Sequence, residues 1–192
     1  MKRNNNPIVI YNAKVIGSFF LLAFIAYGFG RHLFESETVS EKYLGSVLIV
    51  TNSFMVLFIG ILLKKTIQKY SVLVGNIYLF TRVFEAIALA SIVLNLFPSI
   101  SISYNFGYSI AMLVLGLGSI PMCLILLRQK LSPSWLAIWG MIGYAIFAFG
   151  FLMEFFGKEW SLYLLGLGGL WEITFALWLI IKGGRNKKIT NR

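Results

Sequence analysis

The sequence predicts an all-α integral membrane protein, with six transmembrane helices in one bundle and both termini in the cytoplasm. Three observations predict this fold class. Apolar residues make up 58% of the 192 residues and charged residues only 12%, six long apolar runs follow one another, and Lys and Arg gather in alternate connections between the runs. Soluble domains are roughly 45–50% apolar and roughly 25% charged. The composition therefore excludes a soluble globular domain, a disordered chain and a disulfide scaffold.

Each apolar run has the length of a membrane-spanning helix, which takes about 17–25 mostly apolar residues. The runs cover residues 13–30, 46–63, 72–97, 106–127, 135–156 and 162–181. They show no alternation of apolar and polar residues at the strand period, and only helices or closed barrels satisfy the backbone in lipid. We therefore expect a single six-helix domain over residues 1–192, whose longest connection, residues 31–45, is partly helical.

The positions of Lys and Arg predict how the helices are oriented. Of the 17 cationic residues, thirteen lie in segments 1–14, 64–71, 128–134 and 182–192, and three lie in connections on the opposite side. Short cytoplasmic segments carry such an excess, so both termini are expected in the cytoplasm. Residues 183–192 then form a basic cytoplasmic tail, whose expected partners are anionic inner-leaflet lipids. No nucleic-acid partner is expected, because the basic residues lie in short runs between apolar stretches.

A single cysteine and a single histidine limit the chemistry of the chain. Cys123 lies inside an apolar run, and His32 lies just after the first run. One cysteine forms no disulfide within the chain, and one histidine does not build a histidine-rich metal or haem site. No metal and no cofactor are therefore expected.

Three ionisable residues interrupt the apolar runs: Arg82 and Glu85 in the third run and Glu172 in the sixth. Each costs roughly 2.5–3.5 kcal/mol at mid-bilayer, so such groups usually pair or face a cavity. Arg82 and Glu85 are three positions apart and share a helical face, whereas Glu172 lies at a similar depth in another helix. We predict that Arg82 contacts Glu85 or Glu172, with the third and sixth runs packed together. Small residues share the face of Glu172, as close helix packing requires: Gly168, Gly169 and Ala176.

Tyr78, one turn before Arg82, and Asn76 complete the candidate intramembrane binding cluster. One arginine against two glutamates leaves an excess negative charge, which either a proton on one glutamate or a cationic ligand would balance. A purely structural ion pair would need no third charge. The cluster is therefore either a binding or proton-relay site or a buried salt bridge that fixes which helices pair.

Three segments resemble the DUF4386 family of bacterial multi-pass membrane proteins. They are residues 78–86 (YLFTRVFEA), residues 131–136 (LSPSWL) with the glycine- and alanine-rich run that follows, and residues 171–183 (WEITFALWLIIKG). The resemblance implies a six-helix inner-membrane protein with no established activity.

Three classes of function remain in competition. The first is a small permease or solute-binding protein, with Arg82, Glu85 and Glu172 lining a cavity at mid-membrane. The second is a non-catalytic regulator, assembly partner or immunity-type factor whose buried charges are structural. An enzyme is the least favoured class, because the sequence offers no nucleophile–base pair, metal cluster or carboxylate dyad of known spacing and so no catalytic residue. The ligand, any protein partner and the oligomeric state are left open.

Overall fold

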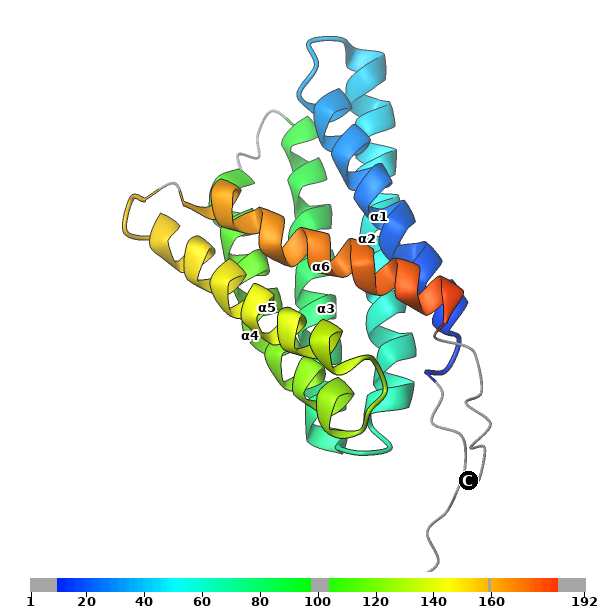
Figure 1. Cartoon of the computed structure of the whole chain (residues 1–192). Coiled ribbons are helices and arrows are strands. Elements are labelled where there is room, and N and C mark those ends of the chain that lie inside the picture. Colours follow the sequence, from blue (N-terminus) through cyan, green and yellow to red (C-terminus); the bar gives the residue numbers. More distant parts are fainter. Residues whose placement is uncertain (1–9, 98–103, 159, 183–192) are drawn as a thin grey trace, which may run out of the picture.

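The computed structural model describes residues 10–97, 104–158 and 160–182, and the regular structure of this part of the chain is helical throughout (Figure 1). The helices are α1 (Ala13–Phe34), α2 (Val39–Ile67), α3 (Val72–Ser91), the short 3-10 helix η1 (Ile92–Leu96), α4 (Tyr104–Arg128), α5 (Ser134–Glu154) and α6 (Ser161–Ile181). The predicted all-α fold class is therefore confirmed.

The helices have the length and apolar character that membrane crossing requires. Among the described residues, α1, α2, α3 with η1, α4 and α5 are each long and apolar enough to cross a membrane, and α6 adds a shorter apolar stretch, Gly166–Ile181. The described helices are thus compatible with a membrane bundle, whereas the count of six crossings and the side on which the termini lie stay predictions.

Two helix boundaries differ from those expected. The connection predicted over residues 31–45 is mostly helix, because no glycine or proline follows Gly30 before Gly45 and Glu41 supports the first turn of α2. In Figure 1 the resulting α1–α2 hairpin extends beyond the other helices. The third run is α-helix to Ser91 and continues as η1 to Leu96. It ends there because Pro98 disfavours helical backbone at Phe97, which is extended.

The six helices form a closed ring. Each helix packs against its neighbours in the sequence, and α6 returns to pack against α1. Gly17 makes this closure feasible, because a Cβ at that position would lie 2.5 Å from the carbonyl oxygen of Ala176. All six helices therefore surround a common centre, and side chains from every helix meet there.

The centre of the ring is filled at the end that holds the first residues of α1 and the last of α6. The side chains that fill it are almost wholly buried: Ile16, Leu63, Ile67, Phe175 and Leu179. Trp171 lies above them, stacked on Phe175 at 4.8 Å, and donates a 2.6 Å hydrogen bond to the Leu136 carbonyl. This packed layer forms a floor beneath the charged cluster.

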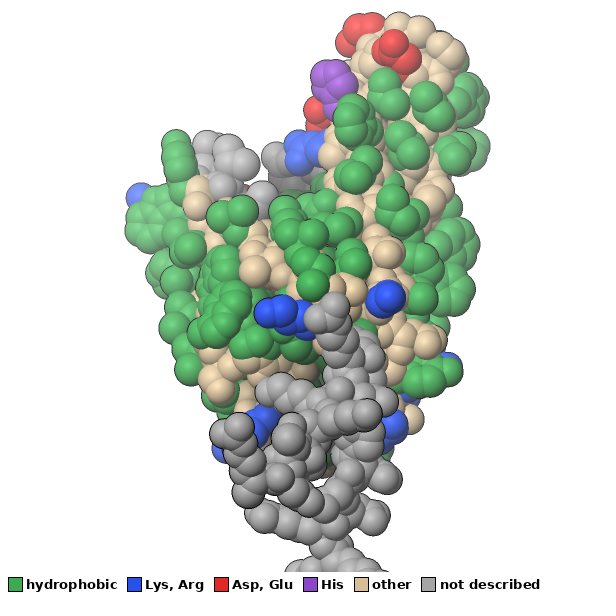
Figure 2. All heavy atoms as spheres, turned by 45° about the vertical axis from the view of Figure 1, so that its right-hand side comes forward, with side chains coloured by type: hydrophobic (Ala, Val, Ile, Leu, Met, Phe, Trp, Pro, Cys, Tyr) green, Lys and Arg blue, Asp and Glu red, His purple; other side chains and the backbone are tan. Residues whose placement is uncertain are grey.

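Charge is distributed unevenly between the two ends of the bundle. On the face shown in Figure 2, Glu side chains lie at the tip of the α1–α2 hairpin, and most Lys and Arg lie toward the opposite end. Residues 183–192, predicted to be a basic tail, lie outside the described residues.

Candidate functional site

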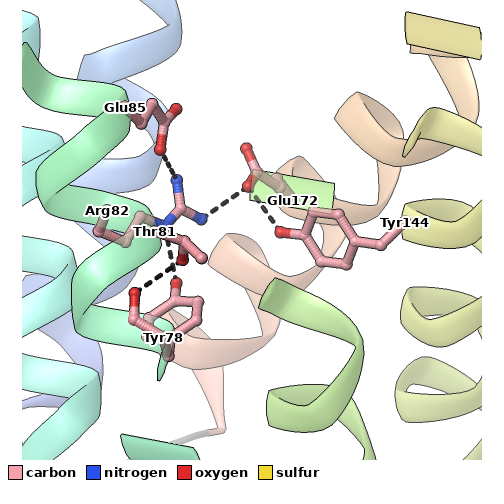
Figure 3. Close-up of polar contacts among 6 residues, drawn as sticks. All are labelled: Tyr78, Thr81, Arg82, Glu85, Tyr144 and Glu172. Carbon is pink, nitrogen blue, oxygen red and sulfur yellow. Dashed lines mark hydrogen bonds and ion pairs between the residues drawn. The ribbon is translucent and has the colours of Figure 1, made fainter. Parts of the chain in front are cut away.

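Arg82 stands at the centre of the ring with only 1% of its surface exposed. Its Nη1 donates to Glu85 Oε2 at 2.9 Å, its Nη2 to Glu172 Oε1 at 2.8 Å, and its Nε to the Tyr78 hydroxyl at 2.9 Å (Figure 3). The guanidinium also lies 5.2 Å from the centre of the Phe20 ring, within range of a cation–π interaction. The contact predicted for Arg82 is thus present with both glutamates at once.

Helix geometry explains the side of α3 that carries this cluster. Tyr78, Arg82 and Glu85 are spaced by four and three positions, so they share one helical face, and all three side chains are buried. Glu172 comes from α6, which packs on α5 and α1 rather than on α3. The expectation that these two helices pack together is therefore wrong, and the ion pair instead crosses the centre of the ring.

Close packing of neighbouring helices holds the Arg82 stem in place. A Cβ at Gly60 of α2 would lie 2.6 Å from Cβ of Arg82, so only glycine leaves room for the stem. On the α4 side, a Cβ at Gly118 would lie 2.0 Å from Thr81 Cγ2. The position of the guanidinium is consequently set by backbone packing as well as by its acids.

Tyr144 of α5 is a member of the cluster that sequence reasoning missed. Its hydroxyl donates a 2.7 Å hydrogen bond to Glu172 Oε1, and its ring meets Trp171 edge-on at 5.1 Å. The available signal was its place in the middle of an apolar run, because a buried tyrosine hydroxyl needs a polar partner.

The structure does not bring Asn76 to the cluster. Asn76 is exposed on the outside of α3 and does not line the central cavity, so its assignment to the site is not supported. Asn52 of α2, only 3% exposed, faces the cavity instead. Asn76 lies two positions before Tyr78 and therefore on another face of the helix. Arg82 and Glu85 lie four and seven positions after Tyr78 and share its face.

A cavity of about 460 Å³ lies against Arg82, Glu85 and Glu172. Each of the six α-helices contributes to its wall, with residues that include Phe20, Asn52, Leu89, Tyr108, Phe147 and Gly169. Small-molecule sites in proteins usually measure about 300–1,000 Å³. The charged cluster is therefore the polar end of a mostly apolar and aromatic chamber of ligand size.

The chamber opens between α1 and α6. Gly28 of α1 and Gly166 of α6 both line it, both are exposed, and a Cβ at either would meet nothing within 4 Å. In Figure 1 the N-terminal half of α6 leans away from α1, which agrees with the exposure of these two glycines. The opening lies at the end opposite the packed floor, which is the outer side in the predicted orientation.

Both glutamates line the cavity, and each has one oxygen that is not held by Arg82. Within the described chain, no hydrogen bond reaches Glu85 Oε1 or Glu172 Oε2, and neither atom is among the fully buried polar atoms that lack a partner. Figure 3 shows both oxygens on the side of the cluster away from Tyr78. The two carboxylates therefore hold Arg82 with one oxygen each and leave the other available to a solute.

The charges that border the cavity do not cancel at its inner end. Arg82 stands between Glu85 and Glu172, which leaves one negative charge in excess when all three are ionised. Arg31 borders the cavity near its mouth, and Glu35 neutralises it through a 2.9 Å ion pair. Over the described residues, no group of three or more His, Cys, Asp and Glu side chains is placed to hold a metal ion.

Residues 99–183 match the family described as "Domain of unknown function (DUF4386)". The match confirms the resemblance that the sequence indicates. It contains Tyr144, Glu172 and two of the three segments that carry the resemblance, whereas the segment with Arg82 and Glu85 precedes it. No curated protein and no solved structure matches the chain.

Proposed function

We propose a solute-binding role for this chain, which belongs to the DUF4386 family through residues 99–183. In this proposal it is a multi-pass protein of the inner (plasma) membrane that takes a small solute or a proton into the ring against Arg82, Glu85 and Glu172. Both termini lie in the cytoplasm, and the basic tail contacts anionic lipids of the inner leaflet. The observation that carries the proposal is that the two glutamates line a ligand-sized cavity.

The arrangement of charge favours this role over a purely structural one. A buried ion pair often contributes little net stability over apolar residues of the same volume, and a third charge adds a further desolvation cost. The cluster nevertheless contains two acids for one arginine, and each acid has one oxygen that is not held by Arg82. A protein that needed only to join α3 to its neighbours would bury one acid and fill the space beside it.

The alternative is a non-catalytic regulator, assembly partner or immunity-type factor whose charges only hold the bundle together. Arg82 is almost completely buried and has three side-chain hydrogen-bond partners. Both features favour a structural role for this residue. In that case the cavity would be closed to solutes, which gives the two proposals different experimental outcomes.

Cysteine accessibility in nanodiscs tests the solute-binding proposal. In a Cys123→Ala background, Leu89→Cys places a thiol on the cavity wall, and Ile87→Cys places one on the outside of the same helix. The probe is methanethiosulfonate ethylammonium, a small water-soluble cation. We expect it to label Leu89→Cys, and to label Ile87→Cys poorly because that side chain faces lipid.

Two phenylalanine variants show whether labelling passes through the opening between α1 and α6. Gly28→Phe puts a ring into open space at the mouth, and Gly107→Phe puts one into open space away from the cavity. We expect Gly28→Phe alone to slow labelling of Leu89→Cys. A Leu89→Cys thiol that resists the reagent in the unblocked protein would contradict solute binding and favour the structural alternative.

A further inference from the structure

We infer that the solute of this cavity is an organic monocation, an ammonium group carried on an apolar or aromatic body. The inference rests on the proposed function and names the chemical class of its ligand.

The inner end of the cavity offers acceptors rather than donors. Glu85 and Glu172 line the cavity, and within the described residues Glu85 Oε1 and Glu172 Oε2 take no hydrogen bond, so both can accept one from an ammonium group. Arg82 lies behind them, and its donors are directed at the acids and Tyr78. An anion would have to displace a glutamate from Arg82, whereas a cation adds to the cluster as it stands and balances its charge.

The walls of the cavity suit the body of such a solute. Aromatic rings line it on several helices: Phe20, Phe24, Tyr27, Tyr108, Tyr144 and Phe147. Tyr27 of α1 and Tyr108 of α4 stack at 5.9 Å and join two helices that are not neighbours in the ring. Aromatic faces attract cations and also bury apolar groups, so they accommodate both parts of an amphipathic amine.

The other charged group on the wall does not oppose a cation at the inner end. Arg31 lies one turn beyond Tyr27 toward the outer end of α1, and its charge is matched by Glu35. The charged residues that border the cavity are therefore a neutralised pair at its mouth, Arg31 with Glu35, and at its inner end the cluster of Arg82 with two glutamates, which has one negative charge in excess. A cation that enters passes from the first to the second.

Three probes with the same phenyl body and different head groups test the inference: phenethylamine, phenethyl alcohol and hydrocinnamate. Binding is measured by calorimetry on the full chain in nanodiscs, with empty nanodiscs subtracted. We expect phenethylamine to bind at least about tenfold more tightly than the alcohol, because a hydrogen bond to a charged group is worth that factor or more. Hydrocinnamate should bind most weakly.

Variants that remove one charge identify the acceptors. Glu85→Gln and Glu172→Gln each bring the cluster to neutrality, so each should weaken phenethylamine about tenfold and leave the alcohol within about twofold. Glu37→Gln removes the same charge at the exposed tip of the α1–α2 hairpin and should change neither affinity. Where a Gln variant does not fold, Gly28→Phe, with its acids intact, should reduce binding of the amine and of the alcohol together.

The possible results separate this inference from the proposed function. Equal affinity for amine and alcohol, both lost in Gly28→Phe, would overturn the cation inference and leave solute binding in place. Tightest binding of hydrocinnamate would overturn it as well and make Arg82 the ligand group. Absence of phenethylamine binding together with a labelled Leu89→Cys would overturn the inference alone, whereas absence of both would overturn the proposed function too.

Discussion

Arg82 Nη2 and Glu172 Oε1 lie 2.8 Å apart, although the helices that carry them are not packed on each other. A long side chain from α3 thus spans the middle of the ring to reach α6. Measurements of stability on variants of this ion pair test its structural role separately from the ligand binding that we propose.

The first prediction concerns the stability of that pair. Arg82→Met leaves two acids buried without their cation, and removing one partner of a buried pair typically costs about 3–5 kcal/mol. Adding Glu172→Gln to Arg82→Met should recover much of that loss, because one of the unpaired charges is then gone. The free energy of unfolding of the wild type, both single variants and the double variant in detergent gives the coupling energy. Strict additivity of the two single effects would show that the residues do not interact.

The second prediction concerns Tyr144, which donates to Glu172 Oε1. Tyr144→Phe keeps the ring contacts with Trp171 and removes the hydroxyl, so it should lower the free energy of unfolding by about 1–3 kcal/mol. Tyr163→Phe is the matched control, because Tyr163 is 82% exposed and should change stability by less than about 0.5 kcal/mol. An equal effect of the two substitutions on detergent unfolding would show that the Tyr144 hydroxyl carries no special stabilisation.

The third prediction concerns the closure of the ring at Gly17. Gly17→Val places a side chain where a Cβ alone would lie 2.5 Å from the Ala176 carbonyl oxygen, so α1 and α6 must separate. Overpacking of this kind typically costs about 1–3 kcal/mol, and backbone collisions are at the upper end. Gly107→Val meets open space and serves as the control. The melting temperature of the purified protein should fall for Gly17→Val only, and similar values for both variants would argue against tight closure.

The fourth prediction concerns orientation. The excess of Lys and Arg in alternate segments puts both termini in the cytoplasm and the α1–α2 connection outside. Paired reporters of cytoplasmic and external location, fused after Ser40 and after Arg192, should therefore give opposite readings. Signals from the same side would refute the predicted topology and, with it, the placement of the cavity mouth on the outer side.

The parts of the site that were predictable are those whose chemistry is out of place in lipid. Arg82, Glu85 and Glu172 stand out because charged groups are costly there, and helical spacing then joins the first two. Phe20 carries no such signal, since aromatic residues are common throughout the chain, and Tyr144 carries only the weaker signal of a hydroxyl within an apolar run. The cavity was predictable only as an alternative, because its existence depends on how far α6 leans from α1, which a one-dimensional pattern does not encode.

The residues at which the helices begin and end were harder to predict than the helices themselves. The apolar run ends at residue 30 because Arg31 and His32 follow, yet α1 continues through them to Phe34. The next helix, α2, begins at Val39 and includes Glu41 and Lys42, because Arg, Glu and Lys are all good helix formers. The pairing of α6 with α1 was not predictable either, because Gly17 and Ala176 are ordinary small residues until the two helices are placed together.

Because the ring closes only when α6 packs against α1, the charged cluster is completed only after the last helix has been synthesised. Glu172 follows Arg82 by 90 residues. Translation at about 5–20 residues per second therefore delays it by roughly 5 to 18 seconds. Arg82 and Glu85 lie three positions apart on one helix, so they can form a neutral pair before Glu172 is synthesised. Glu172, which adds the excess negative charge, lies on α6, and the packing of α6 against α1 also closes the ring around it.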